Sequence, residues 1–573
     1  MERLRTFLKS PLAQHPGLFL RKVASRLGLY REDEPVPNPP VLHLLYPDHW
    51  AVLLREWLAG ISLNSGPHSF GRLFGQDFDE SVLLRLCRTG PAKDTVGLLA
   101  DVKLIWDYSR GHALFTNAAL GPEYTRTSVD FLRRWLQANE NTNGINWTCA
   151  MDVAIRGTNW VFADALLGGR LSEEFGRAEW ASWLWRHGWV IWRRLETKSI
   201  STNHYVADLL GLYVISSIFP DDSAAKAWRR FAETELPRTL VAQTHRDGGL
   251  DEASLRYHAF VTEMALLFRL ASGRRFLPVA EARLCDMCQI VADFQDAAGD
   301  VFPIGDDDSG RVLAVDFVSA SGRAKNLLSL ARVVLRREFK ASPMAVYADS
   351  GWCVRTIGDF RLALEFGGVG LCGVGAHAHN DDFSFCLDWN GQPVIVDPGT
   401  CIYTGDPGAR NRFRSTLAHN TVVCDDREQR PLNSTLFQLR GRTESHAFRA
   451  AGERWTFERS LAPNARHHRE ITPADSAIFI RDSIRAQSRH QLEWRFTLHP
   501  DIHATRVADG FALSLPNGGT LDLKMEPPVK GVDLQVVPAE FSQRYGHHSP
   551  TQRCLARLSA QDCEIRWRIC APA

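Results

Sequence analysis

Apolar residues recur at three- and four-residue spacing through most of the chain between about residues 94 and 337. This spacing places apolar side chains on one face of a helix. Short breaks containing Gly, Pro or Asn separate the periodic stretches, so we expect antiparallel helix pairs in a bundle, a solenoid or a closed ring. The predicted helical stretches are residues 98–115, 127–139, 148–167, 180–195, 203–219 and 254–271.

After about Ser342 the pattern changes to short alternating or β-rich stretches with turn residues between them. The dipeptide Asn390-Gly391 lies between two such stretches and is typical of a tight hairpin. Because no helical stretch separates the strands, we expect antiparallel sheets. The pattern predicts an α+β multidomain chain, with a helical domain at 49–341 and an antiparallel β-sandwich at 342–573.

Residues 1–48 form a separate segment, in which basic and apolar residues alternate before a proline-rich connector. The segment could rest on an anionic membrane surface, pack on a partner, or lie as a solvated flap on the main body. No apolar run reaches membrane-spanning length and no secretory signal pattern is visible, which by sequence favours the cytoplasm. The basic residues among the first thirty positions are Arg3, Arg5, Lys9, Arg21, Lys22 and Arg26.

Length, charge and cysteine usage narrow the class of protein. A chain of 573 residues is too long for a single hydrophobic core, so we expect two or more domains. A net charge of +1 gives no overall attraction to nucleic acid. The 12 cysteines are scattered, which favours a reducing compartment. Cys285 and Cys288 form a CxxC pair in a helix-like stretch, without the second pair that a zinc ribbon needs.

Histidine and acidic residues gather between residues 375 and 421. In a strand, His377 and His379 would share one face, and Asp397 and His419 follow in the next segments. Imidazole and carboxylate groups together suit proton transfer near neutral pH or the binding of a divalent metal. The pattern therefore predicts a chemical site in this part of the chain.

Six segments follow one another along the chain in this order: DVKLIWDYSR, NWTCAMDVAIRGTNW, TNHYVADL, DGG…SLRYHAF, PIGDDDSGR and HAHND…VDPGT…RSTLAHNTV. In this shared order they resemble the heparinase II/III family of polysaccharide lyases and its alginate-lyase relatives. The resemblance implies an (α/α) toroid followed by an antiparallel β-sandwich, with the active site in the cleft between them. It also implies cleavage of uronic-acid polysaccharides by β-elimination, which needs a neutralised substrate carboxylate, a base for the C5 proton and an acid for the leaving oxygen at C4.

The resemblance implies four catalytic residues. Asn203 would neutralise the carboxylate, although Thr202 or Asn203 could instead cap the helix that starts here. Tyr257 would protonate the leaving oxygen, and would also remove the C5 proton when both groups lie on the same side of the sugar. For the opposite stereochemistry, His204 or His377 would be the base.

The resemblance further implies a structural zinc site formed by His379, Asp397 and His419, with water as the fourth ligand and no organic cofactor. Local hydrogen bonding is the alternative for these histidines. The acidic run at 306–308 could bind calcium, accept sugar hydroxyls, or cap a helix start.

Four further residues are expected to contact an acidic sugar chain, namely Trp147, Arg156, Asn159 and Arg414. Guanidinium groups pair with carboxylates, and indole faces stack on sugar rings. For Trp147, packing between helices is an equal alternative. The expected partner is thus an acidic polysaccharide.

Two other functions stay open at this point. A glycoside hydrolase would need two carboxylates across the scissile bond, and Asp251, Glu252 and Asp306 are the candidates. A non-catalytic polysaccharide-binding protein of a bacterial exopolysaccharide assembly system is the second alternative. Family resemblance favours the periplasm or cell envelope over the cytoplasm, while the sugar, its linkage and the oligomeric state stay open.

Overall fold

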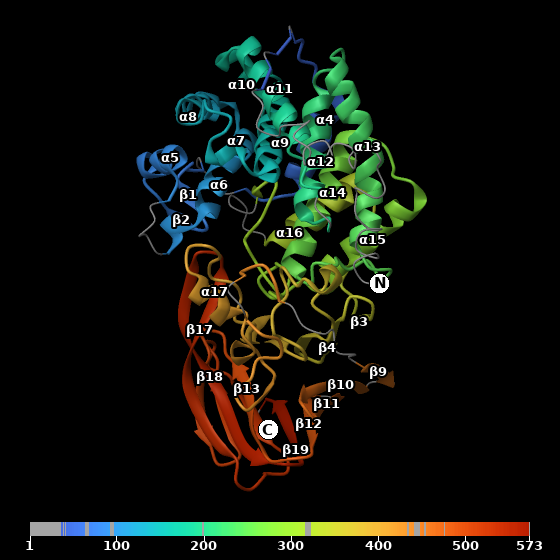
Figure 1. Cartoon of the computed structure of the whole chain (residues 1–573). Coiled ribbons are helices and arrows are strands. Elements are labelled where there is room, and N and C mark those ends of the chain that lie inside the picture. The colour runs from blue at the N-terminus through green and yellow to red at the C-terminus, as the bar shows by residue number, and fades with distance from the viewer. Residues whose placement is uncertain are drawn as a thin grey trace. The chain divides into compact units, whose positions relative to one another are not determined.

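The chain divides into two compact units in the computed structural model (Figure 1). The first comprises Met1–His245, Tyr257–Gln289 and Gly310–Phe339, and the second comprises Arg246–Arg256, Ile290–Ser309 and Lys340–Ala573. Two segments expected in the helical domain, 246–256 and 290–309, therefore belong to the second unit. The structure describes residues 36, 37, 39, 40, 42–63, 68–91, 97–197, 200–315, 322–432, 435–439, 447–451, 454–474 and 476–571. The basic N-terminal residues lie outside this described part, so their surface role stays a prediction.

Helices form most of the first unit, coloured blue to yellow-green in Figure 1. Each of the six predicted stretches is largely helical, and the structure has further helices outside these stretches. The short strands β1 (Arg72–Leu73) and β2 (Gln76–Asp77) pair as an antiparallel ladder. The helices are α4 (Asp48–Ala59), α5 (Glu80–Thr89), α6 (Val102–Arg110), α7 (His112–Leu120), α8 (Thr125–Ala138), α9 (Ala150–Leu166), α10 (Arg170–Phe175), α11 (Arg177–Arg193), α12 (Asn203–Ser217), α13 (Ser223–Gln243), α14 (Leu255–Ser272), α15 (Pro278–Asp293) and α16 (Arg323–Leu335).

Helix ends follow local chemistry. The carboxylates of Asp79, Asp101 and Asp222 accept hydrogen bonds from backbone N–H groups in the first turns of α5, α6 and α13. These bonds satisfy donors that have no partner inside the helix. Gly111 ends α6 in the left-handed conformation, which glycine adopts without strain.

Helix α9 lies at the centre of the first unit, and every one of its residues is buried. It packs against α7, α11 and α12. A side chain at Gly211 of α12 would stand 2.6 Å from the Ala154 Cα of α9, so the close approach of these two helices requires glycine. Among the described residues, no helix is both long enough and apolar enough to cross a membrane.

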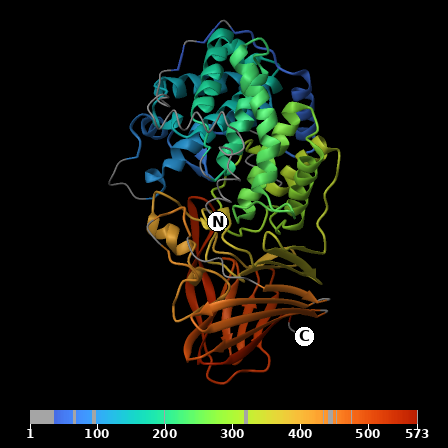
Figure 2. The same ribbon diagram turned by 45° about the vertical axis from the view of Figure 1, so that its right-hand side comes forward.

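Antiparallel strands form most of the second unit, and these yellow-to-red strands stack in layers in Figure 2. The sheets have the orders β3-β4-β5-β6-β7, β17-β18-β13-β8 and β14-β15-β16-β19-β12-β11-β10-β9. The strands are β3 (Met344–Tyr347), β4 (Trp352–Ile357), β5 (Phe360–Glu365), β6 (Phe385–Trp389), β7 (Gln392–Ile395), β8 (Val422–Cys424), β9 (Ala447–Ala451), β10 (Arg454–Ala462), β11 (Ala465–Ala474), β12 (Ala477–Ala486), β13 (His490–Thr497), β14 (His503–Val507), β15 (Gly510–Ser514), β16 (Thr520–Met525), β17 (Asp533–Arg544), β18 (His547–Ala560) and β19 (Cys563–Cys570).

One apolar core joins the three large sheets of this unit. Phe385 of β6, Trp494 of β13 and Trp567 of β19 all belong to it and are buried. The predicted hairpin is confirmed, since Trp389 pairs with Gln392 across Asn390-Gly391, both of which have positive φ. A short helix, α17 (Pro407–Phe413), and a 3₁₀ turn, η6 (Thr416–Ala418), lie between β7 and β8. His377 and His379 lie in the loop between β5 and β6, Asp397 follows β7, and His419 follows η6.

Candidate active site and metal centre

Asp306 is the centre of a buried polar network in the second unit. Both of its carboxylate oxygens accept hydrogen bonds from Arg410, at 2.6 and 2.7 Å. His377 Nδ1 lies 3.0 Å from Oδ2, and His379 Nε2 lies 2.8 Å from Oδ1. One carboxylate therefore orients both histidines and an arginine.

The two histidines reach Asp306 from a loop and not from a strand. Residues 375–380 form bends without a ladder partner, so the expectation of a shared strand face was wrong about the element. The shared direction is nevertheless observed, because both rings contact the same carboxylate. The backbone N–H of Asp306 donates to the His377 carbonyl at 2.9 Å, which fixes the two loops against each other.

Glycine permits this close packing of loops. Gly305 has a φ of 71°, and a Cβ there would stand 2.5 Å from the Ala253 carbonyl oxygen and 2.9 Å from that of His377. Gly375 has a φ of 61° and a Cβ there would also collide with its neighbours. Larger residues at either position would separate the segments that carry Asp306 and His377.

Charge compensation keeps Asp306 ionised. Burial alone would raise the pKa of its carboxyl, but the Arg410 guanidinium and the bonds from His377 and His379 lower it well below the usual range. The other ring nitrogen of His377 lies 3.4 Å from the buried Glu252 carboxylate. His377 is thus placed between two acids, where a protonated ring can donate to both.

The three predicted metal ligands lie together, with their ligand atoms within 4.8 Å of one another. His379 Nδ1 is 3.2 Å from His419 Nε2, and His419 Nε2 is 3.5 Å from Asp397 Oδ2. His419 Nδ1 donates to the Ser415 carbonyl at 2.7 Å, while His379 Nε2 faces Asp306. These outer bonds leave the lone-pair nitrogens of both rings directed toward each other.

This arrangement fits a divalent cation. Burial lowers the pKa of His379, and burial together with His379 lowers that of His419, so both rings are held neutral as metal ligands must be. Burial and the nearby Asp381 raise the pKa of Asp397. Two facing lone pairs and a buried carboxylate would all gain from a positive ion among them, so the predicted trio could hold a metal.

Asn203 and His204 begin helix α12 in the first unit. Thr202 is the N-cap residue and its side chain makes no capping bond, while Asn203 is the first helical residue and is fully buried. His204 Nδ1 lies 3.0 Å from Glu196 Oε2. The buried Cys149 thiol, whose pKa is raised by burial, also donates to this carboxylate at 3.7 Å.

Tyr257 lies in the first turn of α14 and is 5% exposed. Its ring meets Phe260 edge-on at 6.4 Å. The neighbouring side chains diverge as expected from helix geometry. Arg256 pairs with Asp300, and His258 Nε2 lies 3.0 Å from the Met287 carbonyl.

The four expected sugar-contacting residues are buried within their own units. The Arg156 guanidinium lies between the Trp135 and Trp147 rings, at 4.5 and 4.7 Å, and donates to His187. Asn159 donates to the Val312 carbonyl, and Arg414 donates to backbone carbonyls of residues 435–438. The four residues, Trp147, Arg156, Asn159 and Arg414, each have 0% exposure. In the structure these four side chains make packing contacts, and their contact with a sugar chain stays a prediction.

Sequence reasoning did not foresee the roles of Asp306, Arg410, Glu252 and Glu196. Asp306 was noticed as part of an acidic run and, with Glu252, as a candidate hydrolase carboxylate, and neither calcium binding nor helix capping describes its contacts. Its run is not at a helix start, since residues 306–311 are irregular. Each of these groups acts on a histidine or carboxylate 8 to 125 residues away, and no local pattern encodes such a pairing.

Comparison with known proteins assigns both halves of the chain to the same family. Residues 340–569 match the family model for heparinase II/III-like, C-terminal, and residues 124–278 match that for heparinase II/III N-terminus. The chain is also similar to a heparin-sulfate lyase from Bacteroides stercoris, with 21% identity over 368 residues, or 61% of this chain. The match spans about half, 53%, of that relative's length.

Solved structures share the fold over nearly the whole chain. A heparinase III aligns with a TM-score of 0.63 at 14% identity, covering 97% of this chain and 91% of the other. A heparan sulfate lyase from Pedobacter heparinus aligns with a TM-score of 0.55 at 15% identity, covering 99% and 92%. A chondroitin AC lyase from Streptomyces coelicolor A3 gives 0.53 at 12% identity, covering 92% and 83%. These matches confirm the expected fold class, a helical toroid followed by antiparallel sheets.

Proposed function

Because this chain belongs to the heparinase II/III family, we propose that it is a lyase that cleaves a uronic-acid-containing polysaccharide by β-elimination. The family match carries the proposal, because its N-terminal part contains Asn203, His204 and Tyr257 and its C-terminal part contains His377. Relatives are named heparin-sulfate lyase, heparan sulfate lyase and chondroitin AC lyase, which favours a glycosaminoglycan as substrate.

The reaction moves one proton off the sugar and one onto the leaving group. A base takes the C5 proton, the C5–H electrons form the C4–C5 double bond, and the C4–O bond breaks. An acid protonates the departing oxygen, so no water is consumed. Neutralisation of the carboxylate at C5 stabilises the developing enolate and makes the proton acidic enough to remove.

Asn203 and His204 are suited to the carboxylate and the base. An amide N–H at the start of α12 can donate to an anion, and the helix N-terminus favours negative charge there. The Glu196 carboxylate accepts from His204 Nδ1, which places the lone pair on Nε2. His204 is therefore arranged as a proton acceptor for a substrate of the appropriate stereochemistry.

Tyr257 is suited to proton transfer to the leaving oxygen. It would donate its phenolic proton to that oxygen; when the C5 proton lies on the same side of the sugar, Tyr257 would first remove that proton as the phenolate and then pass it on. His377 lies between two carboxylates, with Nδ1 3.0 Å from Asp306 and its other ring nitrogen 3.4 Å from Glu252. We assign His377 to charge stabilisation and His204 to the base role.

A zinc ion bound by His379, Asp397 and His419 would have a structural role. It would fix the loops that carry His379 and His419, and through Asp306 it would hold His377 in place. Bound zinc supplies charge compensation for the buried Asp397. The donor set of two imidazoles and one carboxylate supports zinc over calcium or magnesium.

The test is incubation with heparan sulfate, heparosan, chondroitin sulfate, hyaluronan and alginate, followed by ultraviolet absorbance of the unsaturated uronate. We expect absorbance to rise with at least one polymer. Tyr257→Phe should lower the rate by roughly 10²–10⁴-fold, the range for loss of a general acid or base. Tyr213→Phe is the matched control, because Tyr213 is also 5% exposed in the first unit and should keep activity within about twofold.

Folded protein that gives no absorbance on any uronate polymer would refute the proposal. Product analysis in heavy-oxygen water separates the hydrolase alternative, since a hydrolase incorporates solvent oxygen and leaves no double bond. Polymer binding without any product would favour the non-catalytic alternative.

A further inference from the structure

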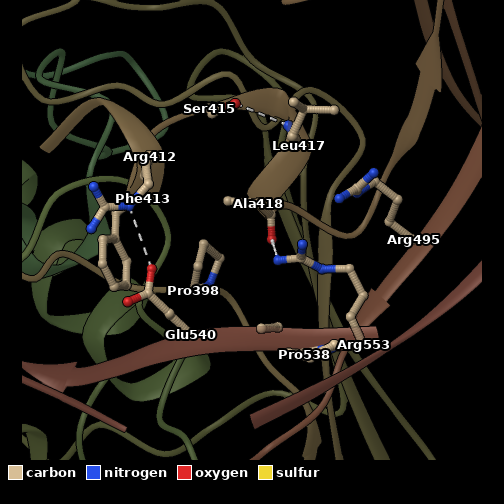
Figure 3. Close-up of a pocket in the computed structure, with 11 residues that line it drawn as sticks. Pro398, Arg412, Phe413, Ser415, Leu417, Ala418, Arg495, Pro538, Glu540 and Arg553 are labelled. Atoms are coloured by element: carbon tan, nitrogen blue, oxygen red, sulfur yellow. Dashed lines mark hydrogen bonds and ion pairs between the residues drawn. The ribbon is translucent and has the colours of Figure 1, made fainter. Parts of the chain in front are cut away.

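A cavity of about 390 Å³ lies in the second unit on the far side of α17 from Asp306. Its walls come from α17, η6, β13, β17 and β18, as Figure 3 shows. Nothing in the proposed elimination uses these residues. The cavity is therefore a candidate for a separate binding site.

Helix α17 separates the cavity from the Asp306 network. Arg410 is fully buried and bonded to Asp306, whereas Arg412 lines the cavity with a side chain that is 59% exposed. Residues two apart on a helix point about 200° apart, so the two arginines leave α17 in opposite directions. The cavity and the Asp306 network thus share one scaffold but not their side chains.

The cavity carries an excess of positive charge. Its lining contains three guanidinium groups, those of Arg412, Arg495 and Arg553, and one carboxylate, that of Glu540. The Glu493 carboxylate beside the cavity pairs with Arg495. Glu540 lies 3.5 Å from Arg412. In Figure 3 the Arg495 and Arg553 guanidinium groups lie beside Ala418, away from Glu540.

Arg553 is a buried cation, and Arg495 is a half-buried cation that pairs with Glu493. Arg553, which is 8% exposed, donates to Thr497 Oγ1 at 2.9 Å and to the Ala418 carbonyl at 3.0 Å, both neutral acceptors. Burial and then Arg495 lower the pKa of Arg553 to about 9. Arg495 bonds Glu493, but its Nε–H is buried without a hydrogen-bond partner among the described residues.

A buried guanidinium group whose acceptors are both neutral, such as that of Arg553, gains from a charged acceptor beside it. The neighbouring Arg495 adds positive charge, which its pair with Glu493 compensates only at one side. A carboxylate or sulfate group between the two guanidinium groups would supply a charged acceptor to both. Arginine's planar donor arrangement matches such oxyanions.

The remaining walls are apolar and suit a ring-sized body. Phe413, Leu417, Pro398 and Pro538 are among the residues that line the cavity (Figure 3). Aromatic and proline faces pack on the C–H faces of sugar rings, and a volume of about 390 Å³ accommodates one or two monosaccharides. A free inorganic ion would leave these walls without contact.

We propose that this cavity binds an acidic saccharide residue, with its carboxylate or sulfate group between Arg495 and Arg553 and its ring against the apolar walls. Only the choice of a saccharide rests on the proposed function, because the charge and the volume are independent of it. The site would hold a polysaccharide at a distance from the bond being cleaved. It would increase affinity for long chains without contributing to the chemical step.

Calorimetric titration of the full chain with monosaccharides tests this proposal apart from catalysis, because monosaccharides have no bond to cleave. The probes are glucuronate, a sulfated N-acetylglucosamine, neutral N-acetylglucosamine and inorganic sulfate. We expect at least one acidic sugar to bind more tightly than inorganic sulfate, and neutral sugar not to bind. Comparison of the first two probes tells whether a carboxylate or a sulfate is preferred.

Arg495→Gln should weaken binding of the acidic sugar by about tenfold or more. Arg557→Gln is the matched control, because Arg557 also pairs with Glu493 but lies outside the cavity, and binding should stay within about twofold. Arg412→Glu, a reversal at an exposed position that folding tolerates, should weaken binding several-fold.

Three results would overturn the proposal: no acidic sugar binds, inorganic sulfate binds as tightly as the sugars, or Arg495→Gln binds like the parent. Failure of this proposal and of the lyase proposal are distinguishable. A protein that binds acidic sugars in an Arg495-dependent manner but releases no unsaturated product supports this site and refutes the lyase. A lyase whose sugar binding is unchanged by Arg495→Gln does the reverse.

Discussion

Asp306 and Asp482 are two fully buried carboxylates of the second unit with closely similar partners. Arg410 bonds both oxygens of Asp306, and Arg469 bonds both oxygens of Asp482, at 2.7 and 2.9 Å. Each carboxylate also bonds imidazole, and the pKa of each is lowered against the opposing effect of burial. Residue types and charges alone do not distinguish the two networks.

The two networks differ in the partner of the second ring nitrogen of each histidine. His467 bonds Asp482 through Nε2 at 2.7 Å, and its Nδ1 accepts from Arg459 at 3.4 Å, so both ring nitrogens have hydrogen-bond partners in the protein. Trp494 completes the set with an N–H bond to Asp482 at 3.1 Å. The Asp482 network is closed, and its role is to join β11, β12 and β13 in the core.

The Asp306 network is open. His379 turns its second nitrogen to His419 Nε2, where two lone pairs face each other, and His377 turns its second nitrogen to Glu252. A cation would complete the contact between His379 and His419. We infer that the facing ring nitrogens of His379 and His419 point to a metal site more clearly than the neighbouring carboxylate does, because Asp482 also has a neighbouring imidazole.

The largest expected effect is on stability, from Asp482→Asn. The change leaves Arg469 buried without its counter-charge, and loss of one partner of a buried ion pair costs roughly 3–5 kcal/mol in unfolding free energy. Urea denaturation measures it, and lyase activity per folded molecule should stay within about twofold. An unchanged unfolding free energy would show that the closed network does not stabilise the fold.

Asp306→Asn should lower kcat/KM of the folded fraction by roughly 10²–10³-fold, the scale for misplaced catalytic groups. The amide loses the charge that orients His377, so Asp306 acts as a positioning residue. Asp482→Asn is the control for general destabilisation, measured at the same folded fraction. Equal losses in both variants would erase the distinction between the open and closed networks.

Metal removal should affect only the open network. We expect the protein to contain about one zinc per chain, with His419→Ala abolishing the metal and His467→Ala retaining it. Binding at 100-fold excess over Kd stabilises by roughly 2.7 kcal/mol, so chelation should lower Tm by a few degrees. Metal analysis and thermal scans measure both, and zinc retained in His419→Ala would place the metal elsewhere.

Much of the fold was predictable because its signals are local. Helices such as α12 and α14 and hairpins such as β6–β7 follow from apolar period and turn residues within one stretch of chain. Membership of residues 290–309 in the second unit was not predictable from such signals. It depends on contacts such as the Asp306 N–H bond to the His377 carbonyl, which join segments 71 residues apart.

The candidate site was predictable to a similar degree. Family motifs identified His379, Asp397 and His419, which the structure brings together. Strand alternation was the wrong reason to place His377 beside His379, because a glycine-rich loop carries both. The burial of the Arg156 guanidinium group against two tryptophan rings was not foreseen, because a motif does not state exposure.

Asp388 is a third buried carboxylate of the second unit, and its pKa is shifted in the direction opposite to that of Asp482. We expect its effect on stability to be smaller and of opposite sign. Burial and the nearby Asp296 raise its pKa to about 7, and its principal hydrogen bond is from the Ala297 N–H at 3.0 Å. Between about pH 4 and this value the folded state binds more protons than the unfolded state, so the unfolding free energy falls as pH rises. Asp482 behaves oppositely, since its lowered pKa contributes stability above about pH 4 that is lost on acidification.

Asp388→Asn should therefore flatten the fall in stability between about pH 4 and pH 7, and should stabilise the protein at about pH 8. A shift of about three pKa units corresponds to at most roughly 4 kcal/mol, and the buried amide retains a desolvation penalty, so we expect a gain of roughly 2 kcal/mol. Urea denaturation across this pH range measures it. Asp359→Asn, at an exposed position, is the control and should change stability by less than about 0.5 kcal/mol. If the unfolding free energy of Asp388→Asn still falls with pH as steeply as that of the parent, another group takes up the proton on folding. The burial of Asp388 without a bonded arginine would then not carry the free-energy cost that we assign to it.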